Sequence, residues 1–209
     1  MTTFFDVFQL SLLVLFLILF VGRTLMLRLR NGVRVLVLGA GKRGARRLVE
    51  LSLMIGLVLW ITAVFSQSLG LLPRSWNPVL LDAFPVRIVG ASLVCLGFVV
   101  FIWALASFGS SWRIGVDTER TGALVTTGAF RHSRNPVFLF IDFYLVGTAF
   151  IYTTPFFIAF AIFGILEVHY QIRQEEKFLG ETYGQLYLDY CRITPRYLGT
   201  VKGRNGGRI

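Results

Sequence analysis

Long apolar runs separated by short polar segments dominate this chain. Three of the runs cover residues 7–27, 48–70 and 84–107. Each is long enough to cross a bilayer as a helix, which takes roughly 20 apolar residues. The first run lacks a basic segment before it and a small-residue cleavage site after it, so we expect a retained span rather than a signal peptide.

Two shorter apolar runs follow, at residues 137–151 and 155–171, and the sequence YTTP at 152–155 interrupts them. Proline suits the first turn of a helix and breaks a helix elsewhere. The interruption therefore predicts a tight hairpin of two helices. The whole pattern predicts an all-α fold, an integral membrane bundle of about five transmembrane helices.

Charge supports this class and predicts an orientation. Only 15% of the 209 residues are charged, and the net charge is +10, whereas soluble domains carry about 25% charged residues. Lys and Arg gather in residues 28–47, 108–136 and after 171, while residues 71–83 and 152–155 hold only Arg74. The positive-inside rule then predicts an outside N-terminus and a cytosolic C-terminus. Because this topology accounts for the basic residues, no nucleic-acid partner is expected.

A G-x-G-x-x-G pattern occurs at Gly39, Gly41 and Gly44, after a short apolar stretch. A dinucleotide site needs this pattern in a βαβ unit with an acidic residue about 20 positions later. No Asp or Glu lies between Glu50 and Asp82, and the helix expected after Gly44 continues into a span. We therefore interpret residues 28–47 as a basic cytosolic loop that can rest on anionic lipid headgroups.

The cysteines and the overall layout add two expectations. Cys95 and Cys191 are far apart and have no neighbouring cysteine, so neither a disulfide nor a metal site is predicted. The chain divides into N-terminal membrane helices (1–104), a polar-rich second half (105–199) and a flexible basic tail (200–209).

A first polar cluster lies just ahead of the hairpin. Arg131, His132, Arg134 and Asn135 directly precede Pro136. The unpaired N–H groups of a helix that begins at this proline would face the arginines, which makes an anion site. The alternative is a set of arginines that only anchors the loop at the membrane surface.

A second polar cluster begins at the end of the last apolar run. Glu167 and His169 lie at membrane depth, where ionisable groups are costly and usually face a cavity or a partner. His169 and Arg173 are four residues apart and share a helix face, and Glu175 and Glu176 follow.

Beyond this cluster, apolar and aromatic residues recur at helical spacing, at Leu179, Tyr183, Leu186 and Tyr190. They predict one amphipathic helix that packs back on the membrane surface or on the loop. Asp142, in the fourth span, lies either opposite His169 or an arginine across the hairpin, or near the interface; the sequence leaves these open.

The hairpin returns the chain to the surface from which it started, so the two clusters can meet. One cluster supplies arginines and amides, and the other supplies carboxylates and tyrosines. Together they predict a polar pocket of both signs beside an apolar bundle. Such a pocket suits a zwitterionic cofactor in water and an oily substrate in the bilayer.

The residues of both clusters resemble a known family. Residues 128–138, GAFRHSRNPVF, resemble the G-x-Y-x-x-x-R-H-P-x-Y signature of the isoprenylcysteine carboxyl methyltransferases and their prokaryotic relatives. Residues 175–196 are similar to the family's E-E-x-x-L-x-x-x-F-G-x-x-Y-x-x-Y-x(4)-P-R pattern without a gap, and the lead-in LVTTGAF is also similar. The resemblance covers roughly residues 105–199.

The resemblance implies a membrane methyltransferase that uses S-adenosylmethionine, in a bacterial inner membrane, with its active site facing the cytosol. The implied cofactor-binding residues are Val125, Gly128, Arg131, Arg134, Asn135, Phe138, Glu175, Glu176, Tyr183 and Tyr187. Three residues depart from the family pattern: Asn135 replaces a His, Phe138 replaces a Tyr, and Phe140 stands where a Gly is common.

Roles for these residues follow from the chemistry of methyl transfer, an in-line displacement in which the enzyme mainly positions the reactants. Arg131 or Arg134 can hold the cofactor's carboxylate, and Glu175 or Glu176 its ribose hydroxyls or ammonium. The aromatic faces that can stabilise the sulfonium are Phe130, Phe138, Tyr183 and Tyr187.

The nature of the methyl acceptor stays open between two classes. A carboxylate needs no general base, and Arg173 or Arg196 could orient it. A thiol or an amine must lose a proton, and Glu167 or His169 could take it. The acceptor is expected to be a lipophilic or small membrane-accessible molecule, and membrane lipids are the expected surroundings; nothing in the sequence predicts an oligomeric state.

Two rival functions share these features. Sterol-type reductases resemble the same C-terminal architecture and bind NADPH, but they carry a Tyr after the R-x-P-N element, where Phe138 stands here. A non-catalytic membrane module would use the arginines and tyrosines only as interfacial anchors.

Overall fold

The computed structural model describes residues 3–31, 45–73, 75, 77–109 and 123–199. The helices in these ranges are α1 (Phe4–Asn31), α2 (Ala45–Ser68), α3 (Phe84–Phe108), α4 (Pro136–Tyr152), α5 (Pro155–Tyr183) and α6 (Gln185–Ile193), with a short 3-10 turn, η2 (Gly128–Arg131), before α4. The glycine pattern at 39–44 and the predicted tail at 200–209 lie outside the described residues.

The chain is an integral membrane helical bundle, as the hydrophobic pattern predicts. Within the ranges that the structure describes, four helices are long and apolar enough to span a bilayer, over Phe4–Leu29, Leu51–Ser68, Phe84–Phe108 and Pro155–Tyr183. The apolar α4 has 17 residues, which gives it a length of about 26 Å at 1.5 Å per residue. It therefore lies near the lower limit for a span.

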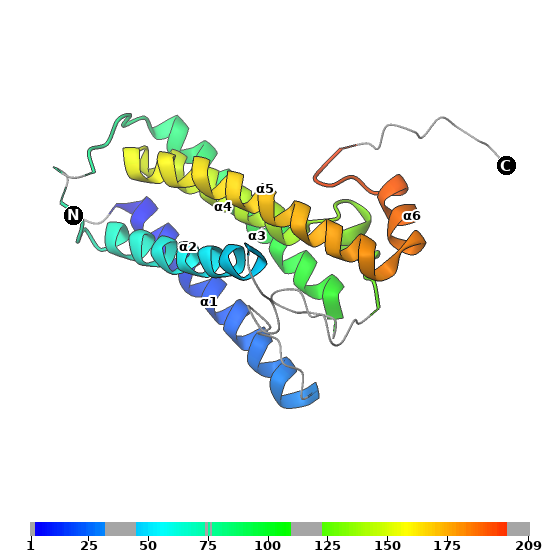
Figure 1. The fold of residues 1–209 in the computed structure, drawn as a ribbon. Coiled ribbons are helices and arrows are strands. Elements are labelled where there is room, and N and C mark those ends of the chain that lie inside the picture. Colours follow the sequence, from blue (N-terminus) through cyan, green and yellow to red (C-terminus); the bar gives the residue numbers. More distant parts are fainter. Residues whose placement is uncertain (1–2, 32–44, 74, 76, 110–122, 200–209) are drawn as a thin grey trace.

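The predicted hairpin is the connection between α4 and α5. Thr153 ends α4 in a left-handed conformation (φ 47°), and its N–H donates to the carbonyl of Ala149 at 2.8 Å. Thr154 is extended, as residues before proline usually are, and Pro155 opens α5. Figure 1 shows α4 and α5 running antiparallel from this turn to the opposite end of the bundle, where α6 folds beside them.

The closest helix packing joins α3 and α4 through two glycines. A Cβ atom added to Gly147 would lie 2.6 Å from the carbonyl oxygen of Gly90, and one added to Gly90 would lie 2.5 Å from the carbonyl oxygen of Gly147. Without side chains, the two backbones approach as small-residue pairs do in membrane helices. This contact joins the end of α4 to the start of α3.

We expect Gly147→Ala to destabilise the protein by roughly 1–3 kcal/mol, because the new methyl group forces apart two backbones that pack directly. The measurement is the unfolding midpoint in mixed detergent micelles. The matched control is Gly22→Ala on α1, where a Cβ atom would meet no atom within 4 Å. Equal midpoints for the two variants would contradict this packing.

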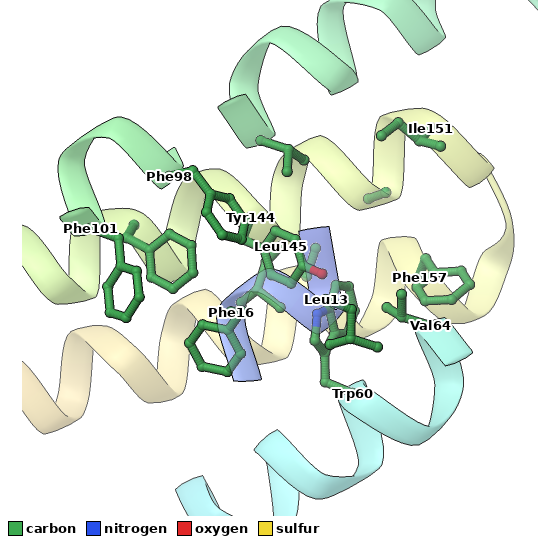
Figure 2. Packing of buried hydrophobic residues seen from close by; sticks show 14 of the residues in the cluster. Leu13, Phe16, Trp60, Val64, Phe98, Phe101, Tyr144, Leu145, Ile151 and Phe157 are labelled. Carbon is green, nitrogen blue, oxygen red and sulfur yellow. The ribbon is translucent and has the colours of Figure 1, made fainter. Parts of the chain in front are cut away.

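Aromatic side chains fill the centre of the bundle (Figure 2). Phe140 of α4 is 3% exposed, and its ring stacks on that of Phe101 with centroids 4.5 Å apart. Trp60 of α2 packs edge-to-face on Phe157 of α5 at 5.3 Å. Phe140, the residue that replaces a common glycine of the resembled family, therefore serves as a central packing residue.

The predicted single amphipathic helix through Leu179, Tyr183, Leu186 and Tyr190 is wrong. The chain turns at Gly184, which has a positive φ of 54°, so that α5 ends at Tyr183 and α6 takes a new direction. As a result α6 buries Tyr187 and Tyr190, while Leu186 is 61% exposed.

Candidate functional site

The loop that leads into α4 is held against the end of α3 by η2. Gly128 has a φ of 61°, and a Cβ atom there would lie 2.2 Å from the hydroxyl oxygen of Ser107. The same oxygen accepts a hydrogen bond from the Ala129 N–H at 2.9 Å. The first glycine of the predicted motif is thus required by its conformation and by this close approach.

Three charged side chains join the turn before α4, helix α5 and the segment after α6. Arg134 binds Oε1 of Glu176 through Nε and Nη2, both at 3.0 Å. Arg196 binds Oε2 of the same carboxylate through Nε at 2.8 Å and Nη2 at 2.6 Å. We call this set the Arg134–Glu176–Arg196 cluster; the side chains of Arg134 and Glu176 are only 11% and 10% exposed.

Hydrogen bonds to the backbone extend the cluster along the C-terminal segment. Arg134 Nη1 donates to the carbonyl of Thr194 at 2.8 Å, and the Arg134 N–H donates to that of Pro195 at 2.9 Å. Asn135 Nδ2 donates to the carbonyl of Arg196 at 3.1 Å and to Glu176 Oε1 at 3.2 Å. The segment that follows α6 is therefore tied to the turn that starts α4.

Ionisation states agree with this arrangement. The hydrogen bond to Glu176 raises the pKa of Arg196. The guanidinium of Arg196 therefore stays charged beside the carboxylate of Glu176. Burial raises the pKa of Tyr190, whose hydroxyl donates to the carbonyl of Phe130 at 2.6 Å. A protonated Tyr190 thus attaches α6 to η2.

The structure brings the two predicted polar clusters together at the end of the bundle where α4 begins and α5 ends. Within this contact every nitrogen of the Arg134 guanidinium has a protein partner. Arg134 therefore positions the turn before α4, and it does not present a free fork to a ligand.

A cavity of about 720 Å³ opens beside this contact. Its volume is within the usual range for small-molecule sites, roughly 300–1,000 Å³. Residues of α1, α2, α4 and α5 form most of its wall, and most of them are aromatic or aliphatic. The polar lining residues are Ser52, Arg134, Asn135, Glu167, Gln171 and Glu175, together with the polar atoms of Trp60 and Tyr144.

The start of α4 gives this cavity a local electrostatic character. The N–H groups in the first turn of a helix have no acceptor within the helix, and they carry the positive end of its dipole. Pro136, Val137 and Phe138 line the cavity in that first turn. Since proline has no N–H, Val137 and Phe138 carry these groups. The wall therefore favours an anionic group at this point, as the sequence predicts for Pro136.

The predicted site residues divide into two sets. The cavity is lined by Phe130, Arg134, Asn135, Phe138, Glu167 and Glu175. The following predicted residues are not among those that line it: Val125, Gly128, Arg131, His169, Arg173, Glu176, Tyr183, Tyr187 and Arg196. Of this second set, Glu176 and Arg196 belong to the ionic cluster, and Tyr187 packs on Tyr190 with ring centroids 6.1 Å apart.

The candidates for handling the methyl acceptor also separate. Glu167 lines the cavity and accepts a hydrogen bond from the hydroxyl of Ser52. His169 instead hydrogen-bonds through Nδ1 to the hydroxyl of Tyr197, and Arg173 is exposed. Asp142 forms no ion pair with a described residue, and its Oδ1 is buried without a hydrogen-bond partner.

Sequence reasoning did not single out Gln171, which is 6% exposed and lines the cavity. A signal for it exists, because Glu167, Gln171 and Glu175 are spaced four residues apart and so lie on one helix face. Ser52, Trp60 and Tyr144 carry no comparable signal, since each is an ordinary residue of an apolar span.

Comparison with known proteins finds a protein family whose model matches part of this chain. Residues 86–186 match the family model described as phospholipid methyltransferase. The matched residues include nearly all of α3, the whole of α4 and α5, and the first two residues of α6. No curated protein and no solved structure matches the chain. The matched region contains the cavity walls contributed by α3, α4 and α5, together with Arg134 and Glu176.

Proposed function

We propose that this protein is a membrane methyltransferase of the family whose model, described as phospholipid methyltransferase, matches residues 86–186. In this proposal it uses S-adenosylmethionine and methylates a lipophilic acceptor held in the cavity. The observation that carries the proposal is the cavity itself. It combines a polar end, at the start of α4, with a long apolar wall inside the bundle. A charged cofactor and an oily acceptor need these two environments side by side.

The residues at the polar end fit the charges of S-adenosylmethionine. The first turn of α4, at Val137 and Phe138, suits a carboxylate, and the carboxylate of Glu175 suits an ammonium. The faces of Phe130 and Phe138 suit a sulfonium through cation–π attraction. When bound, the cofactor supplies an electrophilic methyl group; the protein's task is to orient the two reactants and to exclude water.

The position of Glu167 favours an amine or a thiol as the reacting group of the acceptor. A carboxylate substrate would bring a second negative charge toward Glu167 in a cavity of low dielectric constant, where like charges repel strongly. Neither arginine considered for holding such a substrate is available there, because Arg173 is exposed and Arg196 is bound to Glu176. Glu167, oriented by Ser52, would instead take the proton that an amine or thiol loses.

The proposal places the reaction at the cytosolic face of a bacterial inner membrane. Its support is the charge pattern of the sequence, with Lys and Arg concentrated on the side of the α3–α4 connection and the C-terminal segment. Lipid acceptors would then reach the cavity from the inner leaflet between the apolar helices.

The proposal is tested by equilibrium binding to the protein in lipid nanodiscs. We expect S-adenosylhomocysteine, the product form of the cofactor, to bind at micromolar or lower concentration and NADPH not to bind. Binding of NADPH alone would replace the proposal with a reductase. Binding of neither ligand would indicate a membrane module without catalysis.

A further inference from the structure

The inner part of the cavity contains two hydrogen-bond donors without partners. Trp60 is 3% exposed and Tyr144 is 6% exposed. The indole N–H of Trp60 and the hydroxyl of Tyr144 are buried, and neither has a hydrogen-bond partner among the described residues. Both residues line the cavity, and their rings meet edge-to-face with centroids 6.3 Å apart (Figure 2).

Such a pair calls for an explanation, because buried polar groups are nearly always hydrogen-bonded. A buried donor left without an acceptor costs the full desolvation of that group. The lining residues Leu145, Phe156 and Phe160 have hydrocarbon side chains, which supply no hydrogen-bond acceptor. The ring packing at position 144 would be the same with phenylalanine, which lacks only the hydroxyl.

The position of this pair differs from that of the polar end. On α2, Trp60 is eight residues beyond Ser52, the partner of Glu167, which is about 12 Å along a helix. On α4, Tyr144 is six residues beyond Phe138, which is about 9 Å. The pair therefore lies roughly 9 to 12 Å deeper in the bundle than the groups assigned to the cofactor and to proton transfer.

We propose that Trp60 and Tyr144 form a second polar binding site, which holds an oxygen atom on the hydrocarbon part of the acceptor. A carbonyl oxygen, as in a ketone or an ester, has two lone pairs and can accept from both donors. An amine or an unbroken hydrocarbon chain would leave at least one donor unpaired. The identity of this ligand as the methyl acceptor rests on the proposed function, whereas the binding site itself does not.

The site can be tested without cofactor by comparing two probes of equal chain length, 9-heptadecanone and heptadecane, in detergent solutions of the purified protein. We expect the ketone to raise the unfolding midpoint more than the alkane does. We also expect its carbonyl infrared band to move to lower wavenumber, which reports a hydrogen-bonded oxygen. In Tyr144→Phe, ketone affinity should fall about fivefold, the loss of one hydrogen bond worth about 1 kcal/mol.

The matched control is Tyr152→Phe, on the same helix. Tyr152 is also buried, but its hydroxyl pairs with Ser68 at 2.8 Å and it does not line the cavity. This variant should keep the wild-type preference and band position. Trp60→Phe provides a second removal of a donor and should weaken ketone binding like Tyr144→Phe.

Equal effects of the ketone and the alkane on the wild-type protein would overturn the inference, and so would a Tyr144→Phe variant that keeps the ketone preference. Failure of S-adenosylhomocysteine to bind would overturn the proposed function but leave the ketone result standing. The two ideas therefore fail separately.

Discussion

A protein with Glu176 replaced by glutamine should lose about 100-fold in affinity for S-adenosylhomocysteine while still folding as a helical bundle. Removing one partner from a buried ion pair typically costs about 3 kcal/mol or more. In this structure the carboxylate serves Arg134, Arg196 and Asn135 at once. Arg134 and Arg196 bind different oxygens of the carboxylate, and glutamine replaces one of these oxygens by an NH2 group, which cannot accept a hydrogen bond. The turn before α4, which lines the cavity, would then lose its fixed position.

Two measurements separate this effect from general unfolding. Calorimetric titration in nanodiscs gives the affinity for S-adenosylhomocysteine. Trypsin cleavage after Arg196 should become faster, because the Arg196 side chain loses the carboxylate oxygen that binds it in the wild type.

The control for the Glu176 variant is Asp189→Asn. Asp189 pairs with Arg192 on the exposed face of α6 at 2.9 Å, and surface pairs contribute about 0–1 kcal/mol. Its affinity and cleavage rate should match the wild type. An unchanged affinity in Glu176→Gln, with normal expression, would contradict the positioning role given to this residue.

The main helices could be predicted because each depends on a local rule. Apolar length defines the spans, and Pro155 after two threonines defines the hairpin. The meeting of the two polar clusters was also predictable, since a hairpin returns the chain to the same end of the bundle. Predicting that the two clusters lie close together does not require knowing which side chains touch.

The break between α5 and α6 was not predictable from periodicity. Tyr183 and Leu186 continue an apparent helical stripe, but the positive φ of Gly184 redirects the chain between them. Glycine adopts such a conformation at low cost, and a glycine within an amphipathic pattern does not reveal whether it will. The apolar face of α6 was therefore assigned to the wrong residues.

The hydrogen-bond partners of Arg134 could not be predicted from the sequence, for a different reason. Two of its acceptors are the backbone carbonyls of Cys191 and Thr194. Because every residue has a backbone carbonyl, no residue type in the sequence marks these two as the acceptors. The last carbonyls of a helix lack partners within the helix and attract cations. An arginine read from sequence as a ligand-binding fork thus proves to be engaged at the end of α6.

The roles that we propose for these residues separate the positioning of the ligand from the chemistry of methyl transfer. The Arg134–Glu176–Arg196 cluster joins the turn before α4 to α5 and to the segment after α6, while Glu167 faces the cavity from α5. Substitutions in the cluster should therefore act on ligand affinity. Substitution of Glu167 should act on the rate of methyl transfer.

Glu167→Gln is expected to bind S-adenosylhomocysteine within twofold of the wild type and to transfer methyl groups about 100-fold more slowly, the usual contribution of a positioned base. Glutamine has nearly the same shape and can still accept the hydrogen bond from Ser52, but it cannot take a proton. The measurement is transfer of a labelled methyl group from S-adenosylmethionine to acceptors in a membrane lipid extract. The value of kcat should fall while KM for S-adenosylmethionine stays the same.

Glu181→Gln makes the same chemical change on the same helix, at an exposed position that does not line the cavity, and it should keep full activity. Isolating the labelled product adds an independent check, because a methylated amine or thiol survives mild alkali whereas a methyl ester is hydrolysed. An alkali-labile product formed at an undiminished rate by Glu167→Gln would show that the acceptor is a carboxylate and that Glu167 is not the base. An alkali-stable product whose formation depends on Glu167 would establish proton removal as the part of the reaction that this carboxylate performs.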